Sequence, residues 1–290
     1  MAESFHLQSL RGLMVVLLCW AMSTAGEAAD KITGTLTVKD ALTLPNQTVR
    51  IEARLTGKTL AAAPVWGGVA LQLHIDGKPA GLAKTNEGGQ AIFAYTPKMR
   101  GTNVISVSID AGALVAAEKT EATLCVWERR RPILLVEMAA IMQPREFTSP
   151  SGSFASAGTM TEPPAPPAPD AAAELSRLTQ YYYNVVYVPG SEPSPAEAAI
   201  TGGVRRWLES HKFPAGLVVM PAPGGLSAMI ETFKQDGWTT MKTGIGRTRS
   251  FADTLLHHRM EVVVVPEMPK GELPRKARAA KEWKEVRKKL

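Results

Sequence analysis

Residues 129 to 138 read RRRPILLVEM, and the pattern of the chain changes at this stretch. Three arginines and a proline precede the almost continuous apolar run ILLVEM at 133 to 138. A short apolar run without alternation is typical of a strand that is buried on both faces of a sheet. The sequence therefore predicts a domain boundary near residue 129, with a layered domain beginning just after it.

The residues before this boundary, 30 to 128, are dominated by alternation with period two. In VALQLHI (69 to 75) every second side chain is apolar, as a half-buried strand requires, and Asp76-Gly77 then predicts a hairpin turn. The total of about six or seven such runs is typical of an antiparallel sandwich. The other runs lie at 32 to 38, 48 to 55, 90 to 97, 103 to 110 and 122 to 127.

The stretch from Val69 to Val107 resembles a bacterial immunoglobulin-like module. An Asp-Gly turn is followed by GGQAIFAYTP and then by RGTNVISVSI, in the order found in such modules. The resemblance implies an all-β, immunoglobulin-like sandwich over residues 30 to 128 that spaces, docks or binds, and it implies no catalysis.

Apolar runs and amphipathic segments alternate after the boundary, which predicts an α/β Rossmann-like domain with a parallel sheet over residues 129 to 290. Helices are expected at 170 to 178, 199 to 211 and in two later segments, separated by strands such as YYYNVVYV at 181 to 188. The tyrosines that open this strand are expected in the core. Residues 143 to 169, rich in Pro and Ser, predict an extended and poorly ordered loop.

This second half resembles the haloacid dehalogenase (HAD) superfamily of phosphatases. The resemblance is carried by four fragments in order: PDAAAELSRLTQYYYNVVYV, VRRWLESHKFPAG, FK and GIGRTRSFADTLLHHRMEVVVV. It implies a catalytic Asp-x-Asp after the first strand and a Thr or Ser hydroxyl after the second. It also implies a lysine beside the transferring phosphate and carboxylates that hold magnesium.

Most of these positions hold residues that cannot perform the family's chemistry. Glu137 stands at the nucleophile, one methylene longer than aspartate, and Ala139 stands at the proton donor. A misplacement of about 1 Å can cost about a hundredfold in rate. Pro189 replaces the hydroxyl residue and offers neither a hydroxyl nor an N–H group.

The remaining two positions concern the charges around the phosphate. Lys234 stands at the lysine position, although an exposed helix lysine would give the same pattern. Arg247 and Phe251 stand where carboxylates would hold magnesium, and a guanidinium disfavours a bound cation. The resemblance thus implies a degenerate domain with no cofactor, in which Glu137, Ala139, Pro189, Lys234 and Arg247 line a vestigial pocket.

Three functions remain open from the sequence. The first is a non-catalytic binding or scaffolding protein, whose altered pocket would hold an unknown anionic ligand without magnesium. The second is a magnesium-dependent HAD-type phosphatase, acting on a phosphomonoester or a lipid phosphate, with Glu137 as a displaced nucleophile. The third is an adhesion or assembly module that contacts an envelope protein.

Residues 1 to 29 predict a cleavable signal peptide. Arg11 precedes an apolar run at 13 to 21, and small residues follow. A membrane-spanning helix needs about 20 apolar residues, roughly twice the length of this run. We therefore expect an exported protein, periplasmic or secreted. Cleavage would remove Cys19 and leave Cys125 as the only thiol, so that no internal disulfide can form.

The C-terminal segment, residues 270 to 290, carries nine Lys or Arg residues against three Glu. This composition predicts a basic helix that contacts solvent or an anionic membrane surface. Nucleic acid is a disfavoured partner, because no zinc-finger spacing or aromatic RNA-binding signature accompanies the basic residues. Ser227 and the pair His257-His258 show no catalytic or metal-ligand spacing, and we expect them at helix ends.

Overall fold

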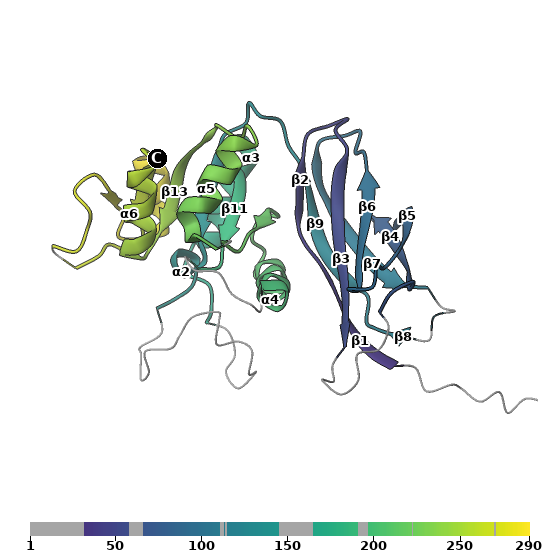
Figure 1. Ribbon diagram of the computed structural model, residues 1–290. Coiled ribbons are helices and arrows are strands. Elements are labelled where there is room, and N and C mark those ends of the chain that lie inside the picture. The colour runs from purple at the N-terminus through teal and green to yellow at the C-terminus, as the bar shows by residue number, and fades with distance from the viewer. Residues whose placement is uncertain are drawn as a thin grey trace, which may run out of the picture.

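The structure is a computed structural model that describes residues 32–57, 66–110, 113, 115–144, 165–190, 197–221, 223–269 and 271–290. The predicted signal peptide lies outside the described residues, as does most of the predicted loop at 143 to 169. The chain forms a β-sandwich followed by an α/β domain, and a short linker joins the two (Figure 1).

The first domain packs two sheets face to face, with strand orders β6-β3-β1-β8 and β2-β9-β7-β4-β5. Alternate residues of each strand point into the core, where Leu55, Leu71, Ile105 and Leu124 are fully buried. The strands are β1 (Ile32–Val38), β2 (Ala41–Thr43), β3 (Val49–Gly57), β4 (Ala70–Ile75), β5 (Lys78–Lys84), β6 (Gln90–Tyr95), β7 (Gly101–Ile109), β8 (Val115–Ala116) and β9 (Thr120–Val126).

The predicted hairpin between β4 and β5 is confirmed. Asp76 and Gly77 both have positive φ, 49° and 75°, and Ile75 pairs with Lys78 across the turn. The expectation of a purely antiparallel sandwich is wrong in two places, because β1 pairs with β8 and β2 pairs with β9 in parallel. Both pairings involve strands of two or three residues that sequence alternation did not reveal.

The second domain is built on one six-stranded parallel sheet with the order β12-β11-β10-β13-β14-β15. Numbered within the domain, this is the doubly wound order 3-2-1-4-5-6. Its elements are β10 (Ile133–Glu137), α2 (Met138–Ile141), α3 (Ala171–Tyr181), β11 (Asn184–Val188), α4 (Glu197–Ser210), β12 (Leu217–Val218), α5 (Gly225–Gln235), β13 (Met241–Gly246), α6 (Arg249–His257), β14 (Glu261–Val264), β15 (Arg278–Ala279) and α7 (Trp283–Lys289).

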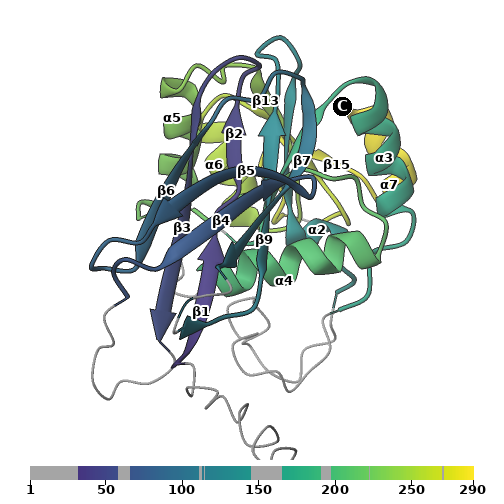
Figure 2. The same cartoon turned by 90° about the vertical axis from the view of Figure 1, so that its right-hand side faces the viewer.

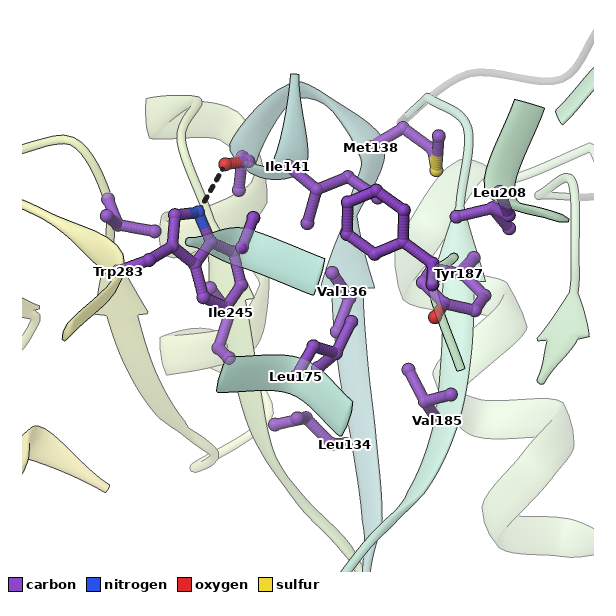
Figure 3. Packing of buried hydrophobic residues seen from close by; sticks show 14 of the residues in the cluster. Leu134, Val136, Met138, Ile141, Leu175, Val185, Tyr187, Leu208, Ile245 and Trp283 are labelled. Carbon is purple, nitrogen blue, oxygen red and sulfur yellow. Dashed lines mark hydrogen bonds between the residues drawn. The ribbon is translucent and has the colours of Figure 1, made fainter. Parts of the chain in front are cut away.

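Helices cover both faces of this sheet, and all five residues of β10 are buried, as the run ILLVEM predicted. Leu134 and Val136 pack toward α2, α3, α4 and α7 (Figure 3), whereas Ile133 and Leu135 pack toward α5 and α6. In Figure 2, α3 and α7 lie together on one side of the sheet, and α5 and α6 lie on the other. Within the described part of the chain, no helix is long and apolar enough to cross a bilayer.

The structure corrects the expectation for the tyrosine run. Tyr181 is the last residue of α3, and β11 begins only at Asn184. Tyr181 and Tyr182 are 69% and 63% exposed and therefore lie outside the core. The helix extends to Tyr181, although tyrosine favours strands, because its apolar side chains recur with helical spacing. These buried side chains are Ala171, Leu175 and Leu178.

The C-terminal segment also differs from the expected single basic helix. Residues 278–279 form the edge strand β15, and only Trp283–Lys289 is helical. Trp283 and Val286 are buried in the domain core, and the Trp283 side chain donates a 3.0 Å hydrogen bond to the Ala140 carbonyl (Figure 3). Gly271 and Pro274 disfavour a helix in the first part of the segment.

The two domains share a hydrophobic cluster and are therefore packed together. Cys125 and Trp127, at the end of the sandwich, belong to the same buried cluster as α5 and α6. Trp127 meets Trp238 edge to face with ring centroids 6.4 Å apart, and the Arg129 guanidinium lies 6.0 Å from the Trp238 ring centroid. Burial of this kind resists relative motion of two domains.

A buried carboxylate reinforces this interface. Asp40 follows β1 in the sandwich and accepts a hydrogen bond of 3.0 Å from the Val218 amide in β12, an edge strand of the other domain. Its other oxygen lies 3.2 Å from Arg205 Nε on α4 and accepts from the Thr123 amide at 2.8 Å. Burial raises the pKa of Asp40, and Arg205 and the two amides oppose that rise.

Candidate functional site

The order of the sheet points to one edge as the place for a site. From β10 the chain runs outward through β11 to β12, and it then crosses to β13 on the other side of β10, which makes a topological switch point between β10 and β13. In open α/β sheets, ligands bind outside the carboxyl ends of the strands at such a point. Here β10 ends at Glu137, β13 ends at Gly246, and α6 begins immediately afterwards.

Glu137 is hydrogen-bonded to the start of α6. One carboxylate oxygen accepts from the amides of Arg247, at 2.6 Å, and Thr248, at 2.9 Å. The Thr248 hydroxyl donates to the other oxygen at 2.5 Å, and the Glu137 residue is only 4% exposed. The amides of Arg247 and Thr248 meet just before the positive end of the α6 dipole, where an anion is favoured. In this protein its own carboxylate occupies that place.

Two glycines of β13 allow this contact. A Cβ atom at Gly246 would overlap the ring of Phe251 and lie 3.0 Å from a carboxylate oxygen of Glu137. A Cβ atom at Gly244 would overlap Leu255. Without side chains at these positions, α6 packs directly on β13, and its first turn lies beside the end of β10.

Thr248 completes the first turn of α6. It is the N-cap residue, and its hydroxyl oxygen accepts a hydrogen bond from the Phe251 amide at 3.3 Å. Sequence reasoning did not single out Thr248. A threonine directly before an amphipathic segment is a helix-start signal that identifies the cap, although it does not reveal that Glu137 is the partner.

Four of the five predicted pocket residues lie at this edge of the sheet. Ala139 is half-buried in α2, and Pro189 directly follows Val188, the register partner of Glu137. Arg247 contributes its backbone amide to the Glu137 contact. Within the described ranges, no hydrogen bond or ion pair joins the side chain of one of these four residues to the side chain of another.

Lys234 lies at the opposite edge, so the expectation of one pocket with five members is wrong. Its ammonium group donates at 3.4 Å to the carbonyl of His258, the residue after α6. A nine-residue helix spans about 13 Å, which separates Lys234 from Glu137 at the other end of α6. The carboxylate and the ammonium thus complement the two ends of one helix dipole.

Phe251, which stands where the resemblance implies a metal ligand, is fully buried in the core. Asp253, an exposed carboxylate of α6, pairs with Arg249 at 3.4 Å. Within the described ranges, no three His, Cys, Asp or Glu side chains gather closely enough to hold a metal ion.

Ser227 and His258 come together although the sequence gave no sign of it. The Ser227 hydroxyl lies 2.7 Å from Nε2 of His258, and burial lowers the pKa of His258, with a further contribution from Lys234. A neutral imidazole can accept a proton from a serine. Across the described part of the chain, however, no carboxylate is hydrogen-bonded to the imidazole to orient it, and the pair connects α5 to the end of α6.

Comparison with known proteins identifies no family. No protein-family model matches the chain, and no curated protein matches it. Solved structures that it resembles include fibronectin(III)-like modules of CbhA from Clostridium thermocellum, with a TM-score of 0.25 at 14% identity over 33% of this chain and 47% of that one.

Two further resemblances cover single β domains. The CARDB domain of a Pyrococcus furiosus protein gives a TM-score of 0.23 at 16% identity over 33% of this chain and 93% of that one. The PKD domain of a human protein gives 0.24 at 14% identity over 36% and 89%. The description of the first domain as a sandwich rests on its own strand pairing.

Proposed function

We propose that this chain is an exported, non-catalytic binding or scaffolding protein, in which an immunoglobulin-like sandwich is joined to a degenerate HAD-like domain. The observation that carries the proposal is that the Glu137 carboxylate accepts three hydrogen bonds from Arg247 and Thr248, the two residues that precede α6. A carboxylate nucleophile must direct a free lone pair at the substrate. Glu137 is buried, and three of its roughly four lone-pair positions accept hydrogen bonds, which a phosphate at the start of α6 would have to displace.

Some observations support the HAD-like part of the proposal, and one counts against it. The order of the sequence fragments and the parallel sheet with a switch point after β10 support it. The place of Lys234 counts against a motif-by-motif alignment, because that alignment requires the lysine beside Glu137. Both observations are compatible with a domain that has kept the parallel-sheet architecture. In such a domain the carboxyl ends of β10 and β13, where catalysis would take place, serve the stability of the fold instead.

Scaffolding is supported by the interface between the domains. The Asp40 contacts and the Trp127–Trp238 pair fix the sandwich against the α/β domain. Arg287, Lys288 and Lys289 at the end of α7 are exposed and remain available for an anionic membrane surface or an envelope protein. A fixed pair of domains presents such surfaces in one orientation.

Hydrolysis of para-nitrophenyl phosphate by the purified protein, with and without magnesium, tests the proposal. We expect background rates for the wild type and for Glu137→Ala under both conditions. The matched control is Asp253→Ala, which removes an exposed carboxylate from α6. Magnesium-dependent turnover that is lost in Glu137→Ala and retained in Asp253→Ala would establish the rival function, a phosphatase with Glu137 as nucleophile.

A further inference from the structure

A pocket of about 360 Å³ lies between the two domains, at the amino edge of the sheet and away from Glu137. Thr102 comes from the sandwich, Arg131 from the linker, Ser176 and Gln180 from α3, and Asn184 from the start of β11. Its volume falls at the lower end of the range of about 300–1,000 Å³ for small-molecule sites.

Two donors in the wall of this pocket lack partners. Nε of Arg131 and the amide nitrogen of Asn184 are buried and have no hydrogen bond among the residues that the structure describes. Another guanidinium nitrogen of Arg131 donates to the Thr179 carbonyl. A buried donor without an acceptor is unfavourable. Because both nitrogen atoms are buried, a ligand oxygen reaches them only when the side chain turns toward the pocket.

The charge and polarity of the wall define the ligand further. Arg131 forms no ion pair with any described residue, and no acidic side chain lines the pocket, so its positive charge is not neutralised there. Thr102, Ser176 and Gln180 carry groups that both donate and accept, which matches the hydrogen-bonding character of hydroxyl groups. The wall thus suits a hydroxylated ligand that carries one negative charge.

Two exposed tyrosines lie between pocket residues along the chain. Tyr181 and Tyr182 directly follow the pocket residue Gln180, and their ring centroids are 6.4 Å apart. The Tyr182 ring lies 6.5 Å from that of Tyr183, which also lines the pocket. Tyrosine provides an apolar ring face and a polar hydroxyl at low entropic cost, and its exposure at a pocket is typical of a binding surface.

We propose that this interdomain pocket binds a sugar acid, a hydroxylated ring that bears a carboxylate. The carboxylate faces Arg131, the ring hydroxyls meet Ser176, Gln180 and Asn184, and the tyrosine pair contacts the ring at the entrance. This inference rests on the proposed binding function and names the class of ligand for it.

Isothermal titration calorimetry of the full chain with glucuronate tests the inference, with glucose and acetate as separate arms. We expect saturable binding of glucuronate, and weaker binding of glucose and acetate by about tenfold or more, because each lacks one half of the recognised chemistry. Arg131→Gln should weaken glucuronate binding by about tenfold or more, whereas Arg130→Gln, the same change at the exposed neighbouring residue outside the pocket, should leave it within about twofold.

If the Arg131→Gln variant does not fold, Gln180→Ala and Tyr182→Ala provide the test, because both residues are exposed and their replacement should leave the fold intact. Both changes should weaken glucuronate binding. Failure to bind glucuronate, equal affinity for glucose, or indifference to these substitutions would overturn the inference. Such a result would leave the background phosphatase rates unchanged. Failure of the ligand inference can therefore be distinguished from failure of the proposed function.

Discussion

Replacement of Glu137 distinguishes a structural role of this residue from a catalytic one. Catalytic groups are often held at a cost in stability, so removing one commonly leaves the protein as stable or more stable. Glu137 accepts three hydrogen bonds from Arg247 and Thr248, the two residues that precede α6, and is 4% exposed. Its removal should therefore destabilise the α/β domain.

The expected magnitude follows from these contacts. Loss of a hydrogen bond to a charged group costs about 1.5–3 kcal/mol, and the amides of Arg247 and Thr248 lose their acceptor together. Because the three bonds are not additive, we expect Glu137→Ala to lower the free energy of unfolding by about 2–5 kcal/mol. Glu137→Gln, which keeps one carbonyl acceptor, should lose about half as much.

Urea unfolding followed by circular dichroism measures this change, provided that the denaturant slope stays constant. Asp253→Asn, a change at an exposed residue of the same helix, is the matched control and should stay within about 0.5 kcal/mol of the wild type. An unfolding free energy for Glu137→Ala that equals that of Asp253→Asn would refute the structural role of Glu137 beside the start of α6.

Three further predictions concern the surroundings of α6 and the interface. Gly246→Ala should destabilise the protein in urea by about 1–3 kcal/mol, because its Cβ meets Phe251 and Glu137, and a loss below about 0.5 kcal/mol would show that α6 is not held there. Lys234→Ala should lower the unfolding free energy by less than about 1 kcal/mol and leave the hydrogen bonds of Glu137 intact. A loss of unfolding free energy as large as that of Glu137→Ala would contradict the placement of Lys234 at the far end of α6. Because the pKa of Asp40 is raised by folding, the folded state binds the Asp40 proton more tightly than the unfolded state does. The difference in unfolding free energy between the wild type and Asp40→Asn should therefore change in favour of the wild type as the pH falls from neutral through the pKa of folded Asp40. An unfolding series across pH 4 to 7 measures this difference, and a difference that shrinks on acidification would be inconsistent with the burial of Asp40.

Much of the fold was predictable because hydrophobic periodicity reports burial. The alternating runs correspond to β1, β3, β4, β6, β7 and β9, and the run ILLVEM corresponds to the fully buried β10. Strand β5 was missed because Pro79 and Gly81 are poor strand formers, which an edge strand tolerates. Strands β2, β8 and β15 have two or three residues, too few to show any period.

The site was less predictable because it depends on contacts between distant residues. Glu137 was recognised as the end of a buried strand, but its partners lie 110 and 111 residues further along the chain. Lys234 was assigned from its position in a short fragment, and that fragment did not show which edge of the sheet the end of α5 reaches. The tyrosine run was assigned from strand propensity, which the helical packing of Leu175 and Leu178 overrode.

The central claim is that the anion site at the switch point is filled by the protein's own carboxylate, and nuclear magnetic resonance of the ¹⁵N-labelled chain tests it most directly. The amide signals of Arg247 and Thr248 are followed while inorganic phosphate and magnesium are added. We predict that neither signal moves in the wild-type protein. Saturable shifts of both signals, with release of the Glu137 carboxylate, would contradict the claim.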